Sequence, residues 1–138
     1  MIKVEHALGR LKGKTIGLLG LSFKPNTDDT RDAPALDIAR MLLDAGAKVQ
    51  AFDPQAMEVS KKEIPALELR KNPYDVAKDA DAILLATEWN EFKSLDFNKI
   101  KTNMRGNVIV DGRNIWDGEE LHGMGFNYFG MGVPEPNG

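Results

Sequence analysis

The sequence predicts an α/β fold: a doubly wound, mostly parallel sheet of about six strands with helices on both faces. Short apolar stretches of strand length alternate along the chain with stretches whose apolar residues have helical spacing. Several apolar stretches end in a polar loop that leads into the next helix, which is typical of parallel sheets. Crossover connections between parallel strands are right-handed, and this rule distributes the helices over the two faces.

The expected strands are apolar runs rich in β-branched and aliphatic residues, bounded by Gly, Pro or Asp. In chain order they are 15–20, 48–52, 67–70, 82–87, 107–110 and 126–129. We expect the Rossmann-like strand order 3-2-1-4-5-6. This order reverses direction between the first and fourth strands, beside the loops 23–31 and 87–92.

The expected helices combine an apolar stripe with a starting or stopping signal. The clearest carries Leu36, Ala39, Leu42 and Leu43 on one face and ends at Gly46. The expected helical ranges are 35–45, 57–62, 73–78 beginning at Asn72, 97–104 and 118–123, with a loop after Trp89. The predicted core includes Ile16, Leu18, Ile38, Leu42, Val49, Ile83, Leu85 and Val108.

Length and composition indicate one globular domain that interacts with neither nucleic acid nor membrane. The chain has 138 residues, 42% of them hydrophobic and 28% charged, with a net charge of −3. No overall positive field attracts nucleic acid or an anionic membrane surface, so an anion site must be local. No apolar run approaches the roughly 20 residues of a membrane span, and no signal peptide is visible. A cytoplasmic location is the default expectation.

Metal and thiol chemistry are not expected. The chain contains no cysteine, which excludes disulfides and a thiolate nucleophile within it. Its histidines, His6 and His122, lie far apart in the sequence and lack metal-type spacing.

The two ends differ from the rest of the chain. Residues 1–11 resemble the last turns of a helix followed by a linker, which indicates a piece of a longer protein. The domain itself is expected over 12–133. Residues 134–138 offer no core-forming side chain and are expected to form a disordered tail.

Cations follow two of the expected strands. Lys24 and Arg31 lie in the polar loop after the first strand, and Pro34 then opens a helix in its favoured position. Arg113 follows the fifth strand in the sequence Asp-Gly-Arg-Asn. Strand ends, polar loops and helix N-termini make the usual anion site of an α/β sheet. The two loops could therefore converge on one ligand, and an arginine fork suits the oxygens of a diphosphate.

Each polar feature also has a structural interpretation. Gly17-x-x-Gly20 matches the dinucleotide-binding fingerprint poorly and is also explained by close strand packing. Asp53 is either a ribose-binding acid or a turn-former before Pro54. Arg113 either binds a ligand or forms a helix-cap ion pair.

The same two interpretations apply to the neighbouring charges and aromatic residues. Asp28 and Asp29 either brace the cations or orient them toward a diphosphate. Trp89 and Phe92 are more typical of packing than of ligand stacking.

Several motifs, in order and at matching spacings, resemble the C-terminal domain of the UDP-glucose/GDP-mannose dehydrogenases. They are Gly-Leu-Ser-Phe-Lys-Pro-Asn-Thr-Asp-Asp-Thr-Arg (20–31), Ala-Pro (33–34), Gly-Ala-Lys-Val (46–49), Phe-Asp-Pro (52–54), Thr-Glu-Trp-Asn-Glu-Phe (87–92) and Asp-Gly-Arg-Asn (111–114). The resemblance covers about 12–133, and the Thr-Glu-Trp and Asp-Gly-Arg-Asn blocks resemble the UDP-glucose branch more than the GDP-mannose branch.

The resemblance implies an enzyme subunit of three parts: an N-terminal NAD-binding domain, a central helical region through which subunits dimerise, and this UDP-binding domain. The implied reaction oxidises the C6 alcohol of the sugar to a carboxylate in two hydride transfers to NAD, through a cysteine thiohemiacetal. By the same resemblance, Phe23 and Lys24 contact the UDP-sugar and Arg113 binds the substrate. Arg31 reaches the NAD held mainly by the other domain.

The chain lacks the cysteine, the NAD-binding glycine motif and the catalytic lysine and asparagine that the resemblance implies. Residues 1–11 then correspond to the end of the central helix, and the partners are the UDP-sugar and the missing domains of a homodimer or larger assembly. We expect no catalytic residue in this chain and no turnover by it alone. The alternatives are a stand-alone nucleotide or nucleotide-sugar-binding module and a structural domain without a ligand. The sugar nucleotide remains open among UDP-glucose, UDP-N-acetylmannosamine and GDP-mannose.

Overall fold

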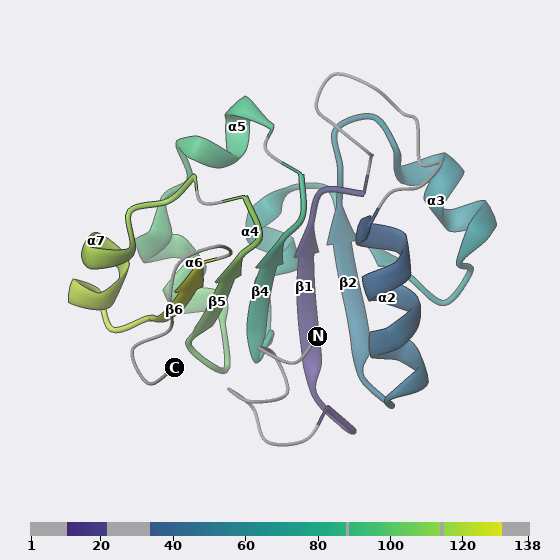
Figure 1. The fold of residues 1–138 in the computed structure, drawn as a ribbon, viewed down its shortest axis with the longest axis horizontal. Helices are drawn as coiled ribbons and strands as arrows, with labels where there is room; N and C mark the ends of the chain where they lie inside the picture. The colour runs from purple at the N-terminus through teal and green to yellow at the C-terminus, as the bar shows by residue number, and fades with distance from the viewer. Residues whose placement is uncertain (1–10, 22–33, 88, 114, 131–138) are drawn as a thin grey trace.

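A computed structural model describes residues 11–21, 34–87, 89–113 and 115–130 (Figure 1). Its sheet has the order β3-β2-β1-β4-β5-β6, and every neighbouring pair is parallel. The strands are β1 Thr15–Leu19, β2 Lys48–Phe52, β3 Glu68–Leu69, β4 Ala82–Leu85, β5 Val108–Asp111 and β6 Asn127–Gly130. The predicted fold class and strand order are confirmed.

The helices predicted between residues 35 and 123 are present, and one further helix occurs where a loop was expected. The helix end predicted within 1–11, apart from Leu11, and the disordered tail predicted for 134–138 lie outside the described residues. The helices are α2 Pro34–Asp44, α3 Met57–Glu63, α4 Pro73–Val76, α5 Asn90–Lys93, α6 Phe97–Asn103 and α7 Gly118–Gly123. The unexpected helix is α5, a single turn whose N-cap residue, Trp89, makes no side-chain capping bond. The turn gives no capping signal in the sequence, and it is fixed by Phe92, which is fully buried.

The ends of the other helices follow local rules that the sequence displays. Asn72, Asp96 and Asp117 cap α4, α6 and α7 by accepting hydrogen bonds from backbone N–H groups of the first turn. Helix α2 ends at Gly46, whose φ of +91° favours glycine. Gly46 N–H donates to Leu43 and Ala47 N–H donates to Leu42, which completes the predicted C-cap as a Schellman motif.

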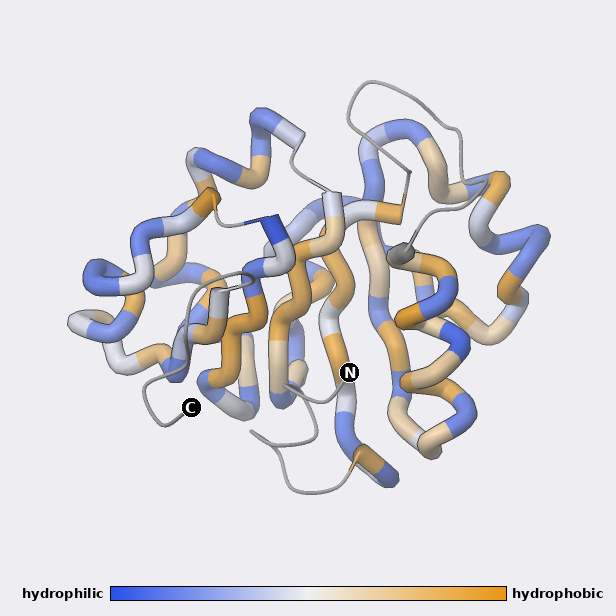
Figure 2. Tube along the Cα trace, in the orientation of Figure 1, coloured by the Kyte–Doolittle hydropathy of each residue, from blue (hydrophilic) through white to orange (hydrophobic). Residues whose placement is uncertain are grey.

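The helices cover the two faces of the sheet with two separate hydrophobic cores. In Figure 1, α2 lies in front of the sheet, whereas α4 lies behind it. In the first core, α2 and α3 pack against side chains such as Leu18 of β1. In the second core, the helices α4, α5, α6 and α7 pack against side chains such as Ile83 of β4. Figure 2 shows the central strands in orange and the outer helices striped with blue, as this layering requires.

Nearly all the predicted core residues are buried, and Ile38 is the exception. Leu36, Ala39 and Leu42 of α2 face the sheet, while Ile38 packs at the margin of the first core and is only partly buried. One residue along a helix is a rotation of about 100°, which moves position 38 from the stripe to its flank.

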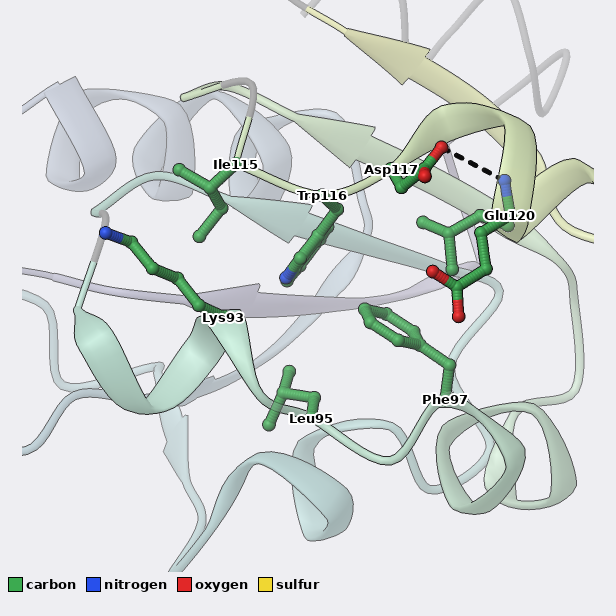
Figure 3. A pocket seen from close by; sticks show the side chains of 8 residues that line it. Lys93, Leu95, Phe97, Ile115, Trp116, Asp117 and Glu120 are labelled. Carbon is green, nitrogen blue, oxygen red and sulfur yellow. Dashed lines mark hydrogen bonds between the residues drawn. The ribbon is translucent and has the colours of Figure 1, made fainter.

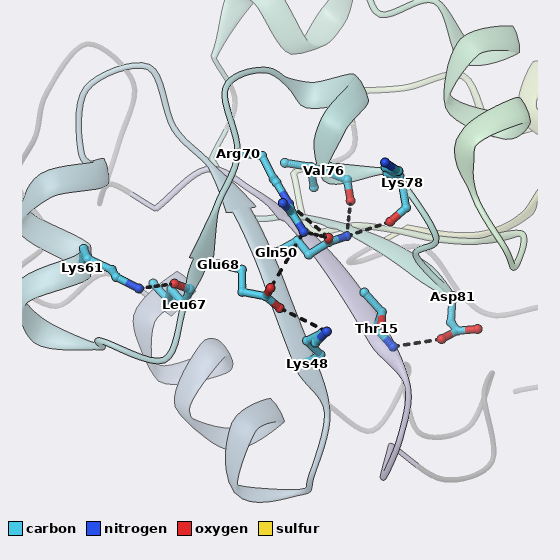
Figure 4. A network of polar contacts seen from close by, with 10 residues as sticks. All are labelled: Thr15, Lys48, Gln50, Lys61, Leu67, Glu68, Arg70, Val76, Lys78 and Asp81. Carbon is cyan, nitrogen blue, oxygen red and sulfur yellow. Dashed lines mark hydrogen bonds and ion pairs between the residues drawn. The ribbon is translucent and has the colours of Figure 1, made fainter.

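A polar network joins β2 and the segment after β3 to the region of α4 (Figure 4). The amide nitrogen of the buried Gln50 in β2 donates to the carbonyl oxygens of Val76 and Lys78, at 3.1 and 2.9 Å. Its oxygen accepts hydrogen bonds from the Arg70 guanidinium. Gln50 thereby pairs both halves of its amide, which makes a polar side chain tolerable beside the second core.

At the amino edge of the sheet, Asp81 joins three segments. Its carboxylate accepts a hydrogen bond from Thr15 N–H at 2.8 Å, and Arg105 reaches both oxygens, at 3.0 and 2.6 Å. Burial alone would raise the pKa of Asp81, but the Arg105 and Thr15 hydrogen bonds and the charges of Arg105 and Lys14 lower it below the ordinary value. Asp81 is thus an ionised side chain that holds three segments together.

In the described residues, no helix is long and apolar enough to cross a membrane.

Candidate functional site at the carboxyl edge of the sheet

The loops that the sequence analysis selected begin at one edge of the sheet. All strand pairs are parallel, so the carboxyl ends of β1, β4 and β5 lie together there. The strand order reverses between β1 and β4, which is the predicted switch point. The ends of β1 and β5 flank β4 and are about 10 Å apart, two strand spacings. One elongated ligand along this edge can reach both.

Gly20 brings the segments after β1 and β4 into close approach. It has a φ of +94°, and a Cβ atom there would lie 2.5 Å from Thr87 Cβ and 2.6 Å from Thr87 N. Gly17 fits a similar constraint, because a Cβ atom there would lie 2.6 Å from Ile83 Cδ1. The packing interpretation of Gly17-x-x-Gly20 is therefore confirmed.

Asp53, directly after β2, is a fully buried carboxylate that organises this edge. Its Oδ1 accepts hydrogen bonds from the N–H groups of Gln55 and Ala56, at 2.9 and 2.8 Å. Its Oδ2 accepts from Leu21 N–H at 2.7 Å and from the Trp89 indole at 3.1 Å. These four donors fill the roughly four lone-pair positions of a carboxylate. The turn-former interpretation is confirmed, and the carboxylate has no position left for a ribose hydroxyl.

Asp111, at the end of β5, plays a similar part for the second loop. Its Oδ1 accepts a hydrogen bond from Arg113 N–H at 3.0 Å. Its Oδ2 accepts from Trp116 N–H at 2.9 Å and from the Tyr128 hydroxyl at 2.8 Å. The carboxylate is fully buried, while the Arg113 side chain is exposed at the molecular surface. Asp111 therefore holds the backbone of the turn, and the turn presents the guanidinium outward.

The two aromatic residues of the segment after β4 are packing residues. Phe92 is fully buried and packs edge to face on Phe52, with ring centroids 6.2 Å apart. Trp89 is 6% exposed, and its indole N–H donates a hydrogen bond to Asp53. Their rings are thus part of the second core.

Of the predicted site residues, Arg113 lies within the described part of the chain. Phe23, Lys24 and Arg31, with the neighbouring Asp28 and Asp29, lie outside the described residues. The anchor of their loop is described, because Asp53 binds Leu21, the residue directly before position 22. The roles of all four site residues stay predictions.

Sequence reasoning did not find the part that Tyr128 and Asp111 play as a pair. Aspartate after a strand is a recognisable turn signal, but its ring donor lies 17 residues further along the chain, on β6. The pairing follows from the neighbouring positions of β5 and β6 in the sheet.

A cavity of about 250 Å³ lies between the segment that joins α5 to α6 and the turn that leads into α7 (Figure 3). Most of the residues that line it have apolar side chains, and Phe97 packs edge to face on Trp116 at 5.2 Å between centroids. Lys93 lies at one end, and Asp117 and Glu120 lie toward the other (Figure 3). Arg113, the predicted site residue within the described part of the chain, is not among the described residues that line this cavity.

Comparison with known proteins supports the family resemblance that the sequence motifs indicate. Residues 17–118 match the model of the UDP-glucose/GDP-mannose dehydrogenase family, UDP binding domain. A UDP-glucose 6-dehydrogenase of Rhizobium meliloti (strain 1021) is 46% identical over 132 residues, which are 96% of this chain and 30% of that protein. The UDP-glucose 6-dehydrogenase TuaD of Bacillus subtilis (strain 168) is 43% identical over 137 residues, which are 99% of this chain and 30% of that protein.

Solved structures share the fold. A UDP-glucose dehydrogenase from Pyrobaculum islandicum is 35% identical with a TM-score of 0.72, over 85% of this chain and 28% of that one. An NDP-N-acetyl-D-galactosaminuronic acid dehydrogenase from Methanosarcina mazei Go1 is 31% identical with a TM-score of 0.81, over 95% of this chain and 27% of that one. The chain spans about 30% of the length of the curated relatives named above.

Proposed function

The chain belongs to the UDP-glucose/GDP-mannose dehydrogenase family, and we propose that it holds the UDP part of the substrate in a longer, NAD-dependent UDP-glucose 6-dehydrogenase. The observation that carries the proposal is the arrangement of the carboxyl edge. Arg113 is presented outward by a turn that a buried carboxylate fixes, beside the point where the strand order reverses. Ligands of open α/β sheets bind at such a point.

In this proposal some of the site residues bind the substrate, and another reaches the cofactor. Phe23 and Lys24 contact the UDP-sugar from the loop after β1, and Arg113 binds its anionic part from the turn after β5. The planar guanidinium donates paired hydrogen bonds that match phosphate oxygens. Arg31 reaches toward NAD, which a separate N-terminal domain holds for the most part.

The chemistry of the reaction lies outside these residues. The chain has no cysteine, so the thiol nucleophile that the family resemblance implies must come from another part of the polypeptide. The chain contributes binding energy and orientation at the UDP end, which fixes the sugar relative to the nucleophile and NAD. Residues 1–11 would join it to a central helix of a cytoplasmic homodimer or larger assembly.

Titration of this chain with UDP, UDP-glucose and GDP-mannose tests the proposal. We expect UDP and UDP-glucose to bind with similar affinity, because the contacts are made to the UDP part, and GDP-mannose to bind more weakly. Arg113→Ala should weaken binding of UDP. The matched control is Arg40→Ala, since Arg40 is an exposed arginine of α2 that pairs with Asp37 and Glu63. Equal binding of all three nucleotides, or equal losses in both variants, would contradict the proposal.

A further inference from the structure

We propose that Tyr128 is a positioning residue for the substrate: its hydroxyl fixes the Asp111 carboxylate, which fixes the turn that carries Arg113. The inference rests on the proposed function, because it assigns Tyr128 to the same UDP-sugar site. It adds a residue that touches no ligand and acts through Asp111.

The first step is the geometry of the turn from Asp111 to Trp116. One carboxylate oxygen of Asp111 holds the N–H of Arg113, and the other holds the N–H of Trp116. The carboxylate therefore closes the turn across its two ends. The backbone of Arg113 keeps its place as long as the plane of this carboxylate is fixed.

The second step is that the backbone donors cannot fix that plane alone. Arg113 and Trp116 belong to the turn itself and would move with it. Among the described residues, Tyr128 is the donor to Asp111 that comes from outside the turn, on the neighbouring strand β6. Its hydroxyl lies 2.8 Å from Asp111 Oδ2 and 3.4 Å from the Trp116 carbonyl, so its single proton serves the carboxylate.

The third step is that the Tyr128 ring is itself held in place. Tyr128 is paired in register with Ile109 of β5, two residues before Asp111 and on the same face of the sheet. The edge of the ring at Cδ1 and Cε1 lies against Gly118, the first residue of α7. A Cβ atom at position 118 would lie 2.8 Å from Tyr128 Cδ1. The ring is thus confined between α7 and the turn.

The fourth step is the protonation state of the phenol. Burial raises the pKa of Tyr128, and the hydrogen bond to Asp111 and the negative charge of Asp111 raise it further. Tyr128 therefore keeps its proton throughout the neutral and mildly alkaline range. A neutral donor fixes the carboxylate without placing a competing cation beside Arg113.

The test uses the full-length dehydrogenase and its steady-state kinetics with UDP-glucose. Tyr128→Phe keeps the ring and removes the hydroxyl. We expect the KM for UDP-glucose to rise about three- to tenfold, the effect of one hydrogen bond, with kcat changed less than about twofold. The KM for NAD should stay unchanged. A general loss of structure would instead lower kcat and both affinities together.

The matched control is Tyr74→Phe, which also removes a hydroxyl that makes one hydrogen bond, accepted from Asp96 N–H at 2.9 Å. Tyr74 belongs to α4, and its hydroxyl binds the segment before α6 instead of Asp111, so we expect an unchanged KM for UDP-glucose. A double-mutant cycle gives the sharper readout. If Tyr128 acts through Arg113, Tyr128→Phe in an Arg113→Ala background should add less than about twofold to KM.

The possible failures are distinguishable. If the wild-type protein does not oxidise UDP-glucose, the proposed function is wrong and this inference falls with it. If Arg113→Ala raises KM but Tyr128→Phe does not, the proposed function stands and the positioning role of Tyr128 is wrong. Additive effects of the two substitutions on KM would likewise overturn it.

Discussion

The two edges of the sheet both use buried aspartates that accept hydrogen bonds from backbone N–H groups, but the side chains that donate to these aspartates differ. At the amino edge, Asp81 is held by the guanidinium of Arg105, whose side chain is 56% exposed. At the carboxyl edge, the donors described above for Asp53 and Asp111 are backbone N–H groups, an indole and a phenol. At the amino edge, the cation Arg105 therefore stabilises the fold by pairing with Asp81. At the carboxyl edge, the donors named here are neutral, which fits the proposal that the cations of this edge bind a ligand.

This difference predicts that substitutions at the two edges have separable effects. Changes to the buried anchors of the carboxyl edge should affect stability. Changes to its surface cations should affect binding, and changes to the amino edge should affect stability in a pH-dependent way.

The largest expected effect is that of Asp53→Asn. The substitution replaces one carboxylate oxygen by an amide N–H₂ group, which cannot accept the hydrogen bonds that this oxygen accepts in the wild-type protein. We expect the free energy of unfolding to fall by about 2–4 kcal/mol, because buried N–H groups are left without an acceptor. Denaturant titration measures it, and Asp44→Asn at the exposed end of α2 is the control. A loss as small as that of the control would show that Asp53 is not an anchor.

Next in size are the effects expected from the cations of the proposed site. In the full-length enzyme, Arg113→Ala or Lys24→Ala should raise the KM for UDP-glucose about ten- to a hundredfold, since each removes a charge-assisted hydrogen bond of the proposed site. Arg113→Lys should keep most of the loss, because a point charge replaces the fork. Arg31→Ala should weaken the use of NAD more than the binding of UDP. Unchanged KM values for both ligands would reduce these cations to braces of their loops.

A smaller effect is expected at the amino edge. The pKa of Asp81 is lowered in the folded state, so its contribution to stability is present above the unfolded pKa and disappears as pH falls through the folded one. Asp81→Asn should cost about 1–2 kcal/mol at pH 7. The stability of the Asp81→Asn variant should also fall less steeply than that of the wild-type protein as the pH decreases below about 4. Thermal unfolding measured over a pH series checks both expectations, and parallel curves for the two proteins would refute the second.

The fold followed from local patterns. Strand β2 and helix α7 have the predicted bounds, because alternating apolar runs, an Asp cap and glycine stops act over a few residues. Helix α5 and the margin position of Ile38 were not predictable in the same way. The helix depends on burial of Phe92, and Ile38 depends on which way α2 rolls against the sheet.

The candidate site was predictable only in part. The sequence placed Arg113 after a strand and indicated a turn at Asp53, since both are local features. The contacts that fix the loops span 36 residues between Asp53 and Trp89 and 17 between Asp111 and Tyr128. Such pairs form because the sheet order brings distant strands together, and composition carries no signal of them.

The most direct test of the account is to map where UDP binds by following the backbone ¹H–¹⁵N chemical shifts of the chain during a titration. The account predicts the largest changes at the carboxyl edge, at Gly20, Leu21, Thr87 and Arg113, with the amino-edge residues Thr15 and Arg105 unaffected. Changes concentrated at the amino edge, or around Phe97 and Glu120 in the cavity beside α7, would contradict the claim that the carboxyl edge is the UDP site.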